Sequence, residues 1–190
     1  ALRSEDVEKV LEADEVEGYL VVEWVSHESE ILLVGNEQDP ERIILTHYDS
    51  TWGGFIDNGF TVSLLIQLLD ELDLEENLVV FAGAEEISQE SPYHCYGYRR
   101  FEDEYLKQIR EAEEIFLADS LGRNTQKVIE DPDIVEKAIV LNREGYEDKV
   151  KFVASEYHEV LDIYHSPKDT VKALNSYEEA VELVCSELGL

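Results

Sequence analysis

The chain has 190 residues, enough for one domain with a substantial hydrophobic core. Its hydrophobic fraction of 44% is ordinary for a globular protein and excludes an intrinsically disordered chain. The formal net charge of −30 excludes nucleic acids and anionic membrane surfaces as partners, because proteins bind both through basic patches. No apolar run approaches the roughly 18 residues that a membrane-spanning helix needs.

Three explanations of the acidity stay open at this point: adaptation to a high-salt cytoplasm, an acidic metal site, and self-repulsion that favours solubility. A metal site accounts for only a few carboxylates, so most of the charge belongs to the surface. The scarcity of lysine fits salt adaptation, whereas the excess of glutamate over aspartate fits it less well.

The first residues, Ala-Leu-Arg-Ser-Glu-Asp, lack the apolar core of a signal peptide, so we expect a cytoplasmic protein. The spacing of Cys95 and Cys185 is not that of a thiolate metal site. Cys185 lies on an apolar helical face and is expected in the core. A disulfide between the two cysteines stays open.

The predicted elements alternate between strands and helices along the chain. In chain order they are a helix over residues 4–13, a hairpin of 19–25 and 31–34, a strand over 42–46, a helix over 59–72, a strand over 78–82, a helix over 98–111, a strand over 115–118, a helix over 132–143, a strand over 150–154 and a helix over 176–188.

Local signals support several of these boundaries. Gly53-Gly54 predicts a turn after the first long strand. Pro132 suits the first turn of a helix, and Ser176 with Glu179 predicts a capping box for the last helix.

Alternating strands and helices predict an α/β fold with three αβα layers and a mixed, mostly parallel central sheet, which the opening hairpin makes mixed. No internal repeat, low-complexity tract or linker divides the sequence. We therefore expect a single catalytic domain over residues 1–190.

Imidazoles and carboxylates follow apolar strands at several separate places. His47-Tyr48-Asp49-Ser50 and Gly83-Ala84-Glu85-Glu86 each end a buried strand, Asp119 ends another, and Tyr164-His165 lies in a later loop. Side chains beyond the carboxyl ends of parallel strands converge on one crevice. The expected cluster is a metal site suited to zinc, with cobalt or manganese as substitutes, made of His47, Asp49, Asp57, Glu85, Glu86, Asp119 and His165.

Five motifs occur in order over residues 42–188: His-Tyr-Asp-Ser, Asp57-Asn58-Gly59, Phe-Ala-Gly-Ala-Glu-Glu, Ala-Asp-Ser-Leu-Gly and Tyr-His-Ser-Pro-Lys-Asp-Thr. In this the chain resembles the co-catalytic di-zinc aminopeptidase family. That family comprises zinc exopeptidases related to bacterial leucine aminopeptidases, the glutamate carboxypeptidases and the glutaminyl cyclases. The resemblance implies the zinc-exopeptidase, phosphorylase/hydrolase-like architecture.

The resemblance also implies a ligand set for two zinc ions. His47 and Asp119 would bind one ion, Glu86 and His165 the other, and Asp57 would bridge them. The peptide bond that follows Asp57 is expected to be cis in this family.

Three further residues would act in catalysis. The resemblance makes Glu85 the general base that takes a proton from a metal-bridged water and delivers it to the leaving amine. The Tyr164 hydroxyl would help to hold the oxyanion. Asp49 stands two residues beyond His47, so a continued strand would let its carboxylate orient that imidazole.

Departures from the family limit what the resemblance implies. The interval from His47 to Asp57 and that from Asp119 to His165 are short, and the loops that shape substrate pockets lie there. Substrate preference therefore cannot be transferred. A trimmed chain favours an open site or one completed by a neighbouring subunit in a homo-oligomer. His94, His158 and Asp169 are given no role at the metals.

The expected function is a zinc-dependent aminopeptidase that hydrolyses the N-terminal residues of short peptides. A carboxypeptidase or amidohydrolase on the same scaffold is an alternative, but candidate clamps for a substrate carboxylate are few: Arg99, Arg100, Arg123 and Lys168. A non-catalytic metal-binding relative is a third alternative, although every expected ligand and the base are present.

If salt adaptation explains the acidic surface, the melting temperature should rise between low and molar salt, because screening weakens repulsion between exposed carboxylates. Differential scanning calorimetry over a sodium chloride series measures this. A melting temperature that stays flat would contradict the high-salt explanation.

Overall fold

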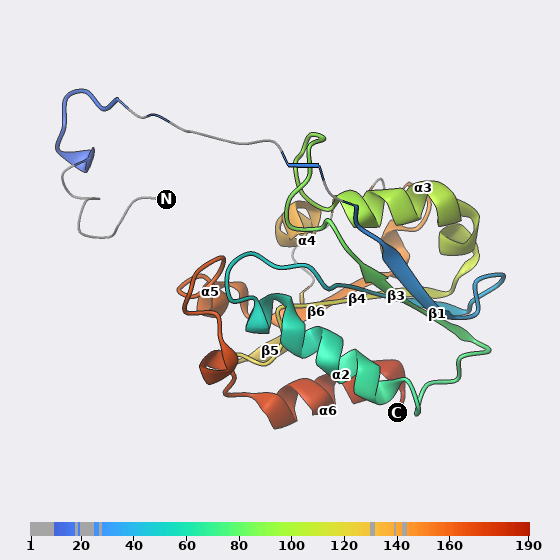
Figure 1. The fold of residues 1–190 in the computed structure, drawn as a ribbon. Helices are drawn as coiled ribbons and strands as arrows, with labels where there is room; N and C mark the ends of the chain where they lie inside the picture. The colour runs from blue at the N-terminus through green and yellow to red at the C-terminus, as the bar shows by residue number, and fades with distance from the viewer. Residues whose placement is uncertain are drawn as a thin grey trace.

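A single mixed sheet forms the centre of the computed structural model (Figure 1). The structure describes residues 10–17, 19, 25–26, 28–129, 132–138, 140–141 and 144–190. Within these residues the sheet has 6 strands in the order β1-β3-β2-β4-β6-β5. They are β1 (Ile31–Gly35), β2 (Arg42–His47), β3 (Asn77–Ala82), β4 (Glu114–Asp119), β5 (Gln126–Ile129) and β6 (Val150–Ser155).

The four inner strands, β3, β2, β4 and β6, are parallel, whereas β1 and β5 lie antiparallel at the two edges. Every residue of β3 is buried, as expected for a parallel strand that is covered on both faces. Because β2 and β3 pair with His47 opposite Ala82, their carboxyl ends finish at the same edge of the sheet.

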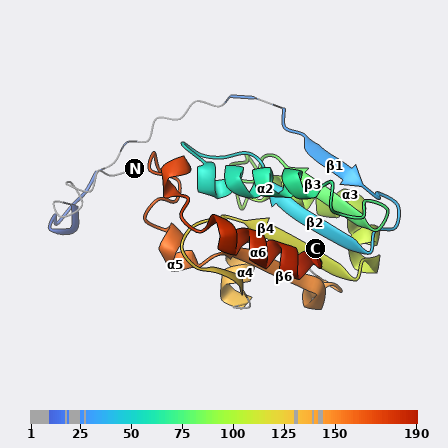
Figure 2. The same cartoon turned by 90° about the horizontal axis from the view of Figure 1, so that it is seen from below.

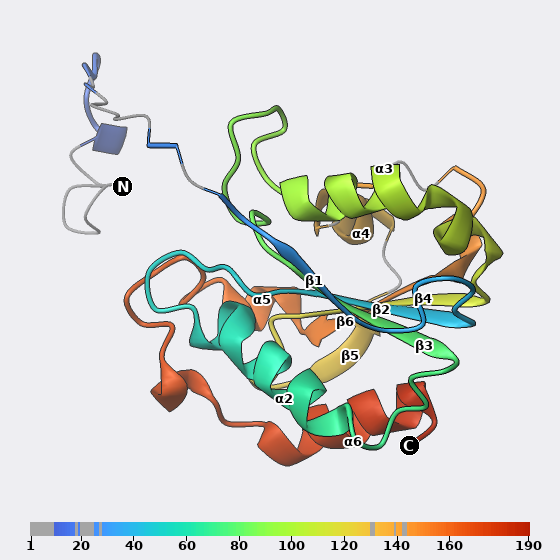
Figure 3. The same cartoon turned by 45° about the vertical axis from the view of Figure 1, so that its right-hand side comes forward.

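Helices cover both faces of the sheet (Figures 1 and 3). The helix α2 (Phe60–Leu68) and the helix α6 (Tyr177–Leu188) lie side by side on one face, as Figure 2 also shows. The helices α3 (Tyr96–Glu111) and α4 (Pro132–Ala138) cover the other face. The short helix α5 (Tyr157–Val160) lies at the carboxyl edge of the sheet, and short turns occur at Phe55–Gly59, Glu147–Lys149 and Val171–Ala173.

The strand alternation divides the core into two apolar clusters. Ile43 and Leu45 of β2 pack with α3 and α4, whereas Ile44 between them packs with α2 and α6. Successive side chains on a strand point to opposite faces, so one apolar run supplies both clusters. The expected three-layer α/β architecture is confirmed. In the described part of the chain, no helix is long and apolar enough to cross a membrane.

Several predicted boundaries differ from the structure. The helix predicted over residues 59–72 ends at Leu68, the one predicted from residue 98 begins at Tyr96, and α4 ends at Ala138 instead of residue 143. Strand β5 was not predicted. It and β1 make the sheet mixed, through antiparallel pairing with β6 and β3. Most of the predicted helix over 4–13 and of the strand over 19–25 lies outside the described residues.

The predicted capping box of α6 is wrong. Ser176 precedes α6, but its hydroxyl donates to the carbonyl of Asn124 and makes no cap hydrogen bond. Glu179 instead accepts from the backbone N–H of Gln126 at 3.4 Å. Both side chains that were expected to cap the helix instead form hydrogen bonds with the backbone at Asn124 and Gln126.

Both cysteines are free, which answers the open question of a disulfide. Cys95 belongs to the cluster under α3 and α4, whereas Cys185 packs against the cluster under α2 and α6. The sheet separates them, so they cannot bond to each other. Cys185 is partly exposed and lies at the margin of the core, although the sequence predicted a position inside the core.

Candidate active site

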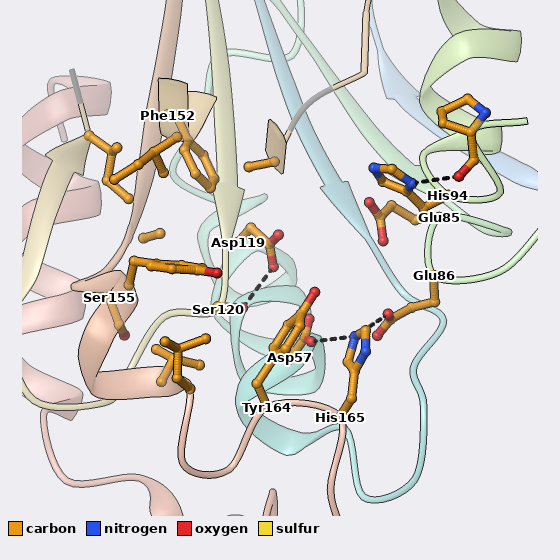
Figure 4. A pocket seen from close by; sticks show the side chains of 18 of the residues that line it. Asp57, Glu85, Glu86, His94, Asp119, Ser120, Phe152, Ser155, Tyr164 and His165 are labelled. Atoms are coloured by element: carbon orange, nitrogen blue, oxygen red, sulfur yellow. Dashed lines mark hydrogen bonds and ion pairs between the residues drawn. The ribbon is translucent and has the colours of Figure 1, made fainter. Parts of the chain in front are cut away.

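The carboxyl edge of the sheet carries the expected metal ligands (Figure 4). His47 ends β2, Asp119 ends β4, and Glu86 lies in the turn after β3. Asp57 comes from the turn before α2, and His165 from the loop after α5. Figure 4 shows Asp57, Asp119, Glu86 and His165 pointing toward a common space.

Asp57 occupies the centre of this group. Its Oδ1 lies 3.3 Å from His47 Nε2, and its Oδ2 lies 3.4 Å from His165 Nε2. Each imidazole also meets a second carboxylate: His47 Nε2 lies 3.2 Å from Asp119 Oδ1, and His165 Nε2 lies 2.5 Å from Glu86 Oε2. The site thus has two halves that share one aspartate.

The distances around Asp57 suit metal ligands, whereas the 2.5 Å between His165 Nε2 and Glu86 Oε2 is a hydrogen-bond distance. Two atoms that each lie about 2.0–2.1 Å from a tetrahedral zinc are about 3.3 Å apart, close to the spacing around Asp57. One ligand atom each from His47, Asp57 and Glu86 lie within 4.8 Å of one another. Asp57 is only 3% exposed, and within the described residues its buried Oδ2 has no hydrogen-bond partner. A cation would satisfy that oxygen.

The pKa shifts of the site residues also favour bound cations. Burial alone would raise the pKa of Asp57, but the two histidines lower it to about 2. Burial and then the charge of Asp57 raise the pKa of Glu86 to about 8. Burial alone would lower the pKa of His47, but the carboxylate of Asp119 and its acidic neighbours hold it well above the usual value. The site therefore attracts positive charge, and divalent ions would supply it.

Glu85 faces the same cavity but stands outside these close contacts. Burial raises the pKa of its carboxyl group. Its Oε1 accepts a hydrogen bond from the Cys95 thiol at 3.0 Å. Tyr164 also lines the cavity, with its ring stacked on His165 at 3.8 Å between centroids. Burial and then nearby carboxylates raise the pKa of Tyr164, so its hydroxyl keeps its proton.

The cavity beside the metal ligands has a volume of about 530 Å³. Its wall away from the ligands is apolar and consists of Ile129, Ile134, Ala138, Phe152, Ala154, Val160 and Leu161. His94, which was given no role from the sequence, also lines it. Its Nδ1 lies 3.1 Å from the carbonyl oxygen of Pro92 (Figure 4).

No family model matches the sequence, and no curated protein matches it. Solved structures do match. A glutaminyl cyclase from an Acidobacteriales bacterium shares 18% identity at a TM-score of 0.57, over 84% of this chain and 71% of that one. A Zn-dependent exopeptidase from Parabacteroides distasonis shares 13% identity at a TM-score of 0.62, over 85% and 77% of the two chains. An aminopeptidase from Aneurinibacillus sp. strain AM-1 shares 17% identity at a TM-score of 0.55, over 84% and 45%.

The chain has the zinc-exopeptidase fold. Within this fold, the expected cis peptide bond between Asp57 and Asn58 is present. Asn58 joins the turn that carries it to two strand ends: its Nδ2 donates to Thr46 Oγ1 at 2.9 Å, and its Oδ1 accepts from the Ser120 N–H at 3.1 Å. Asp57 is thereby fixed between β2 and β4.

The Asp49 carboxylate faces His47 and also makes contacts that the sequence did not predict. His47 Nδ1 lies 3.6 Å from Asp49 Oδ1 and 3.0 Å from the Asp49 backbone carbonyl oxygen. That carboxylate accepts the backbone N–H groups of Glu85 and Glu86, at 3.1 and 3.0 Å. The Asp49 carboxylate therefore also holds the turn after β3.

Sequence reasoning missed the role of Asp169 in this zinc-exopeptidase fold. The residue is 1% exposed, and its carboxylate accepts the backbone N–H groups of Ile56 and Asp57, at 2.6 and 3.1 Å. A Cβ on Gly53 would lie 1.9 Å from the Asp169 carbonyl oxygen, so only glycine permits this close approach. The one local signal was the nearness of Asp169 to His165 in the sequence.

Replacing Asp169 should loosen the turn that carries Asp57. In Asp169→Asn an amide group would face one of the two buried N–H donors, and an unsatisfied buried donor costs about 1–3 kcal/mol. We expect urea unfolding to show a free energy of unfolding lower by that amount. The exposed Asp70, changed to asparagine, is the matched control. Equal stability of the two variants would contradict this role.

Proposed function

We propose that the protein is a zinc-dependent exopeptidase, most simply an aminopeptidase that releases N-terminal residues from short peptides. The observation that carries the proposal is the placement of Asp57, whose two carboxylate oxygens face two different histidines. Each histidine has its own second carboxylate, so the chain offers two half-sites with one shared ligand.

In this proposal His47 and Asp119 hold one zinc ion, Glu86 and His165 hold the other, and Asp57 contacts both. Cobalt or manganese could replace zinc at such nitrogen and oxygen ligands. When bound, the ions would supply Lewis acidity, which polarises a carbonyl and lowers the pKa of water from 15.7 toward ~7.

The chain's own residues move the proton. Oε1 of Glu85 is held by the Cys95 thiol, and no described residue hydrogen-bonds to Oε2. Oε2 would accept a proton from the attacking water and pass it to the leaving amine. The protonated Tyr164 hydroxyl would donate to the carbonyl oxygen as negative charge develops there.

The described lining of the cavity offers no cationic side chain to pair with a substrate carboxylate. Among the described residues that line it there is no lysine or arginine, whereas Asp57, Glu85, Glu86 and Asp119 all line it. Arg123, one of the few candidate clamps, pairs with Asp162 at 2.9 Å. A carboxypeptidase would need a cation for the C-terminal carboxylate, so the N-terminal ammonium group is the better match.

Cyclisation of N-terminal glutamine is the second candidate, because several solved structures with this fold are glutaminyl cyclases. In that reaction the substrate's own α-amine attacks its side-chain amide carbonyl and ammonia leaves. The products separate the two candidates: an aminopeptidase releases a free amino acid from leucyl and glutaminyl peptides, whereas a cyclase releases ammonia from glutaminyl peptides alone. Cleavage of blocked dipeptides would indicate a carboxypeptidase or amidohydrolase.

Glu85→Gln should reduce kcat by about 10²–10⁴-fold, because the amide cannot accept the proton. The zinc content should stay at the wild-type value, since Glu85 is not a ligand. Steady-state kinetics on an amino-acid nitroanilide and elemental analysis measure the two effects. Glu86→Gln is the matched comparison and should lose zinc together with activity. Near-full turnover of Glu85→Gln with metal bound would exclude Glu85 as the base.

His165→Ala should lower the zinc content from two ions per chain to one, because the half-site of His47 and Asp119 stays intact. Asp57→Ala should weaken both half-sites, since it removes the shared ligand. Elemental analysis after dialysis against a zinc buffer measures the stoichiometry. Loss of both ions in His165→Ala, or of neither, would contradict the assignment of separate half-sites.

The apolar wall should favour substrates with a large apolar first side chain. One methylene in an apolar pocket is worth about 10–200-fold in kcat/KM, so leucyl or phenylalanyl nitroanilide should exceed glycyl nitroanilide by at least about 10-fold. Aspartyl nitroanilide should be the poorest substrate, because the apolar wall would desolvate its carboxylate and the described lining offers no lysine or arginine to pair with it. A preference for glycyl or aspartyl substrates would place the first side chain outside this cavity.

A further inference from the structure

We propose that Cys95 is a positioning residue that holds the carboxylate of Glu85 in the orientation needed for proton transfer. This inference rests on the proposed role of Glu85 as general base. Nothing in the sequence motifs pointed to Cys95, and its thiol takes no part in the metal half-sites described above.

Two contacts connect Cys95 to Glu85. The thiol donates to Glu85 Oε1 at 3.0 Å, and the backbone N–H of Cys95 donates to the Glu85 carbonyl oxygen at 2.6 Å. Cys95 is 0% exposed, and Glu85 is buried apart from the side that lines the cavity. Cys95 therefore hydrogen-bonds to both the main chain and the side chain of Glu85.

The backbone around Cys95 packs closely on the turn that carries Glu85. Cys95 has a left-handed conformation, with φ 54°, directly before α3. The Gly97 N–H then donates to the Ala84 carbonyl at 3.3 Å, and a Cβ on Gly97 would lie 2.1 Å from the Gly83 carbonyl oxygen. The start of α3 thus packs directly on the turn that carries Glu85, which places the Cys95 side chain beside the Glu85 carboxylate.

The consequence concerns which oxygen of Glu85 can react. A glutamate side chain that is free to rotate loses conformational entropy whenever it must adopt one orientation. The Asp49 carboxylate fixes the Glu85 backbone N–H, and Cys95 fixes Oε1. Oε2 is left as the oxygen that faces the substrate, and a fixed proton acceptor lowers the barrier to proton transfer.

A second acceptor does not displace Glu85 from the thiol. The carbonyl oxygen of Ala138 lies 3.5 Å from Cys95 Sγ, but a thiol has one hydrogen to donate. The carboxylate is both closer and charged, and hydrogen bonds to charged acceptors are the stronger ones. Burial and the neighbouring Glu85 raise the pKa of the thiol, so the sulfur keeps the hydrogen that it donates.

The first test compares Cys95→Ala with Cys95→Ser in the zinc-loaded protein, using the best nitroanilide substrate of the wild type. Alanine removes the donor, and serine restores one on a side chain of similar size. We expect kcat of Cys95→Ala to fall about 10-fold, a barrier increase of about 1.4 kcal/mol, with KM within about 2-fold of the wild type. Cys95→Ser should recover to within about 3-fold. The partly exposed Cys185, changed to alanine, is the matched control and should leave kcat unchanged.

The second test is independent of turnover and of bound metal. In the Cys185→Ala protein, Cys95 carries the only thiol, and its S–H stretching band is visible by infrared spectroscopy. A thiol bonded to a carboxylate should absorb at a lower frequency than a free thiol. In Cys185→Ala/Glu85→Ala the band should return toward the free-thiol frequency. This measurement requires no substitution at Cys95, so it holds even if those variants fold poorly.

A free-thiol band in Cys185→Ala would overturn the inference, as would wild-type kcat in Cys95→Ala or a Cys95→Ser no better than Cys95→Ala. These outcomes are distinct from failure of the proposed function. If the zinc-loaded wild type releases neither amino acid nor ammonia from any substrate, the proposed function fails. If the wild type is active and Cys95→Ala equals it, only the role of Cys95 fails.

Discussion

The Asp57 carboxylate is buried between two histidines, and the polar contacts at the carboxyl edge of the sheet hold it there. A buried charge is costly unless it is paired and hydrogen-bonded, and Asp57 is 3% exposed. Two imidazoles face its oxygens, and a third residue, Asp169, accepts its backbone N–H. The turn that carries Asp57 is joined through Asn58 to the ends of β2 and β4. Much of the polar structure at this edge of the sheet serves to keep one carboxylate in place.

The inner strands and the clustering of the expected ligands could be predicted from sequence because their signals are local. Each inner strand is an apolar run, and in a parallel sheet a polar residue directly after such a run must lie at the carboxyl edge. This places His47, Glu86 and Asp119 together before any contact is known. Asp57 and His165 needed the ordered motifs of the family resemblance, since they come from turns. The cis peptide bond after Asp57 was implied by the same resemblance and is present.

The features that could not be predicted from sequence are contacts between residues that lie far apart in the chain. Asp169 contacts backbone groups more than a hundred positions away, and its own surroundings predict only a turn. The Ser176 hydroxyl donates to the loop before β5 and therefore does not cap α6. The strand β5 itself is short and shows no clear alternation of polar and apolar residues. The bonds of the Asp49 carboxylate to the backbone N–H groups of Glu85 and Glu86 were not predicted, because they join two strand ends that are distant in the sequence. Cys95 resembles any buried core cysteine until its distance to Glu85 is known. In each case a tertiary contact decided the outcome.

Diffraction at the zinc absorption edge can show whether two metal ions share Asp57, as proposed. Crystals grown with zinc should show two anomalous peaks per chain. One should lie between Asp57 and the pair of His47 and Asp119, the other between Asp57 and the pair of Glu86 and His165. A single peak, or peaks that do not contact Asp57, would contradict the shared-ligand account.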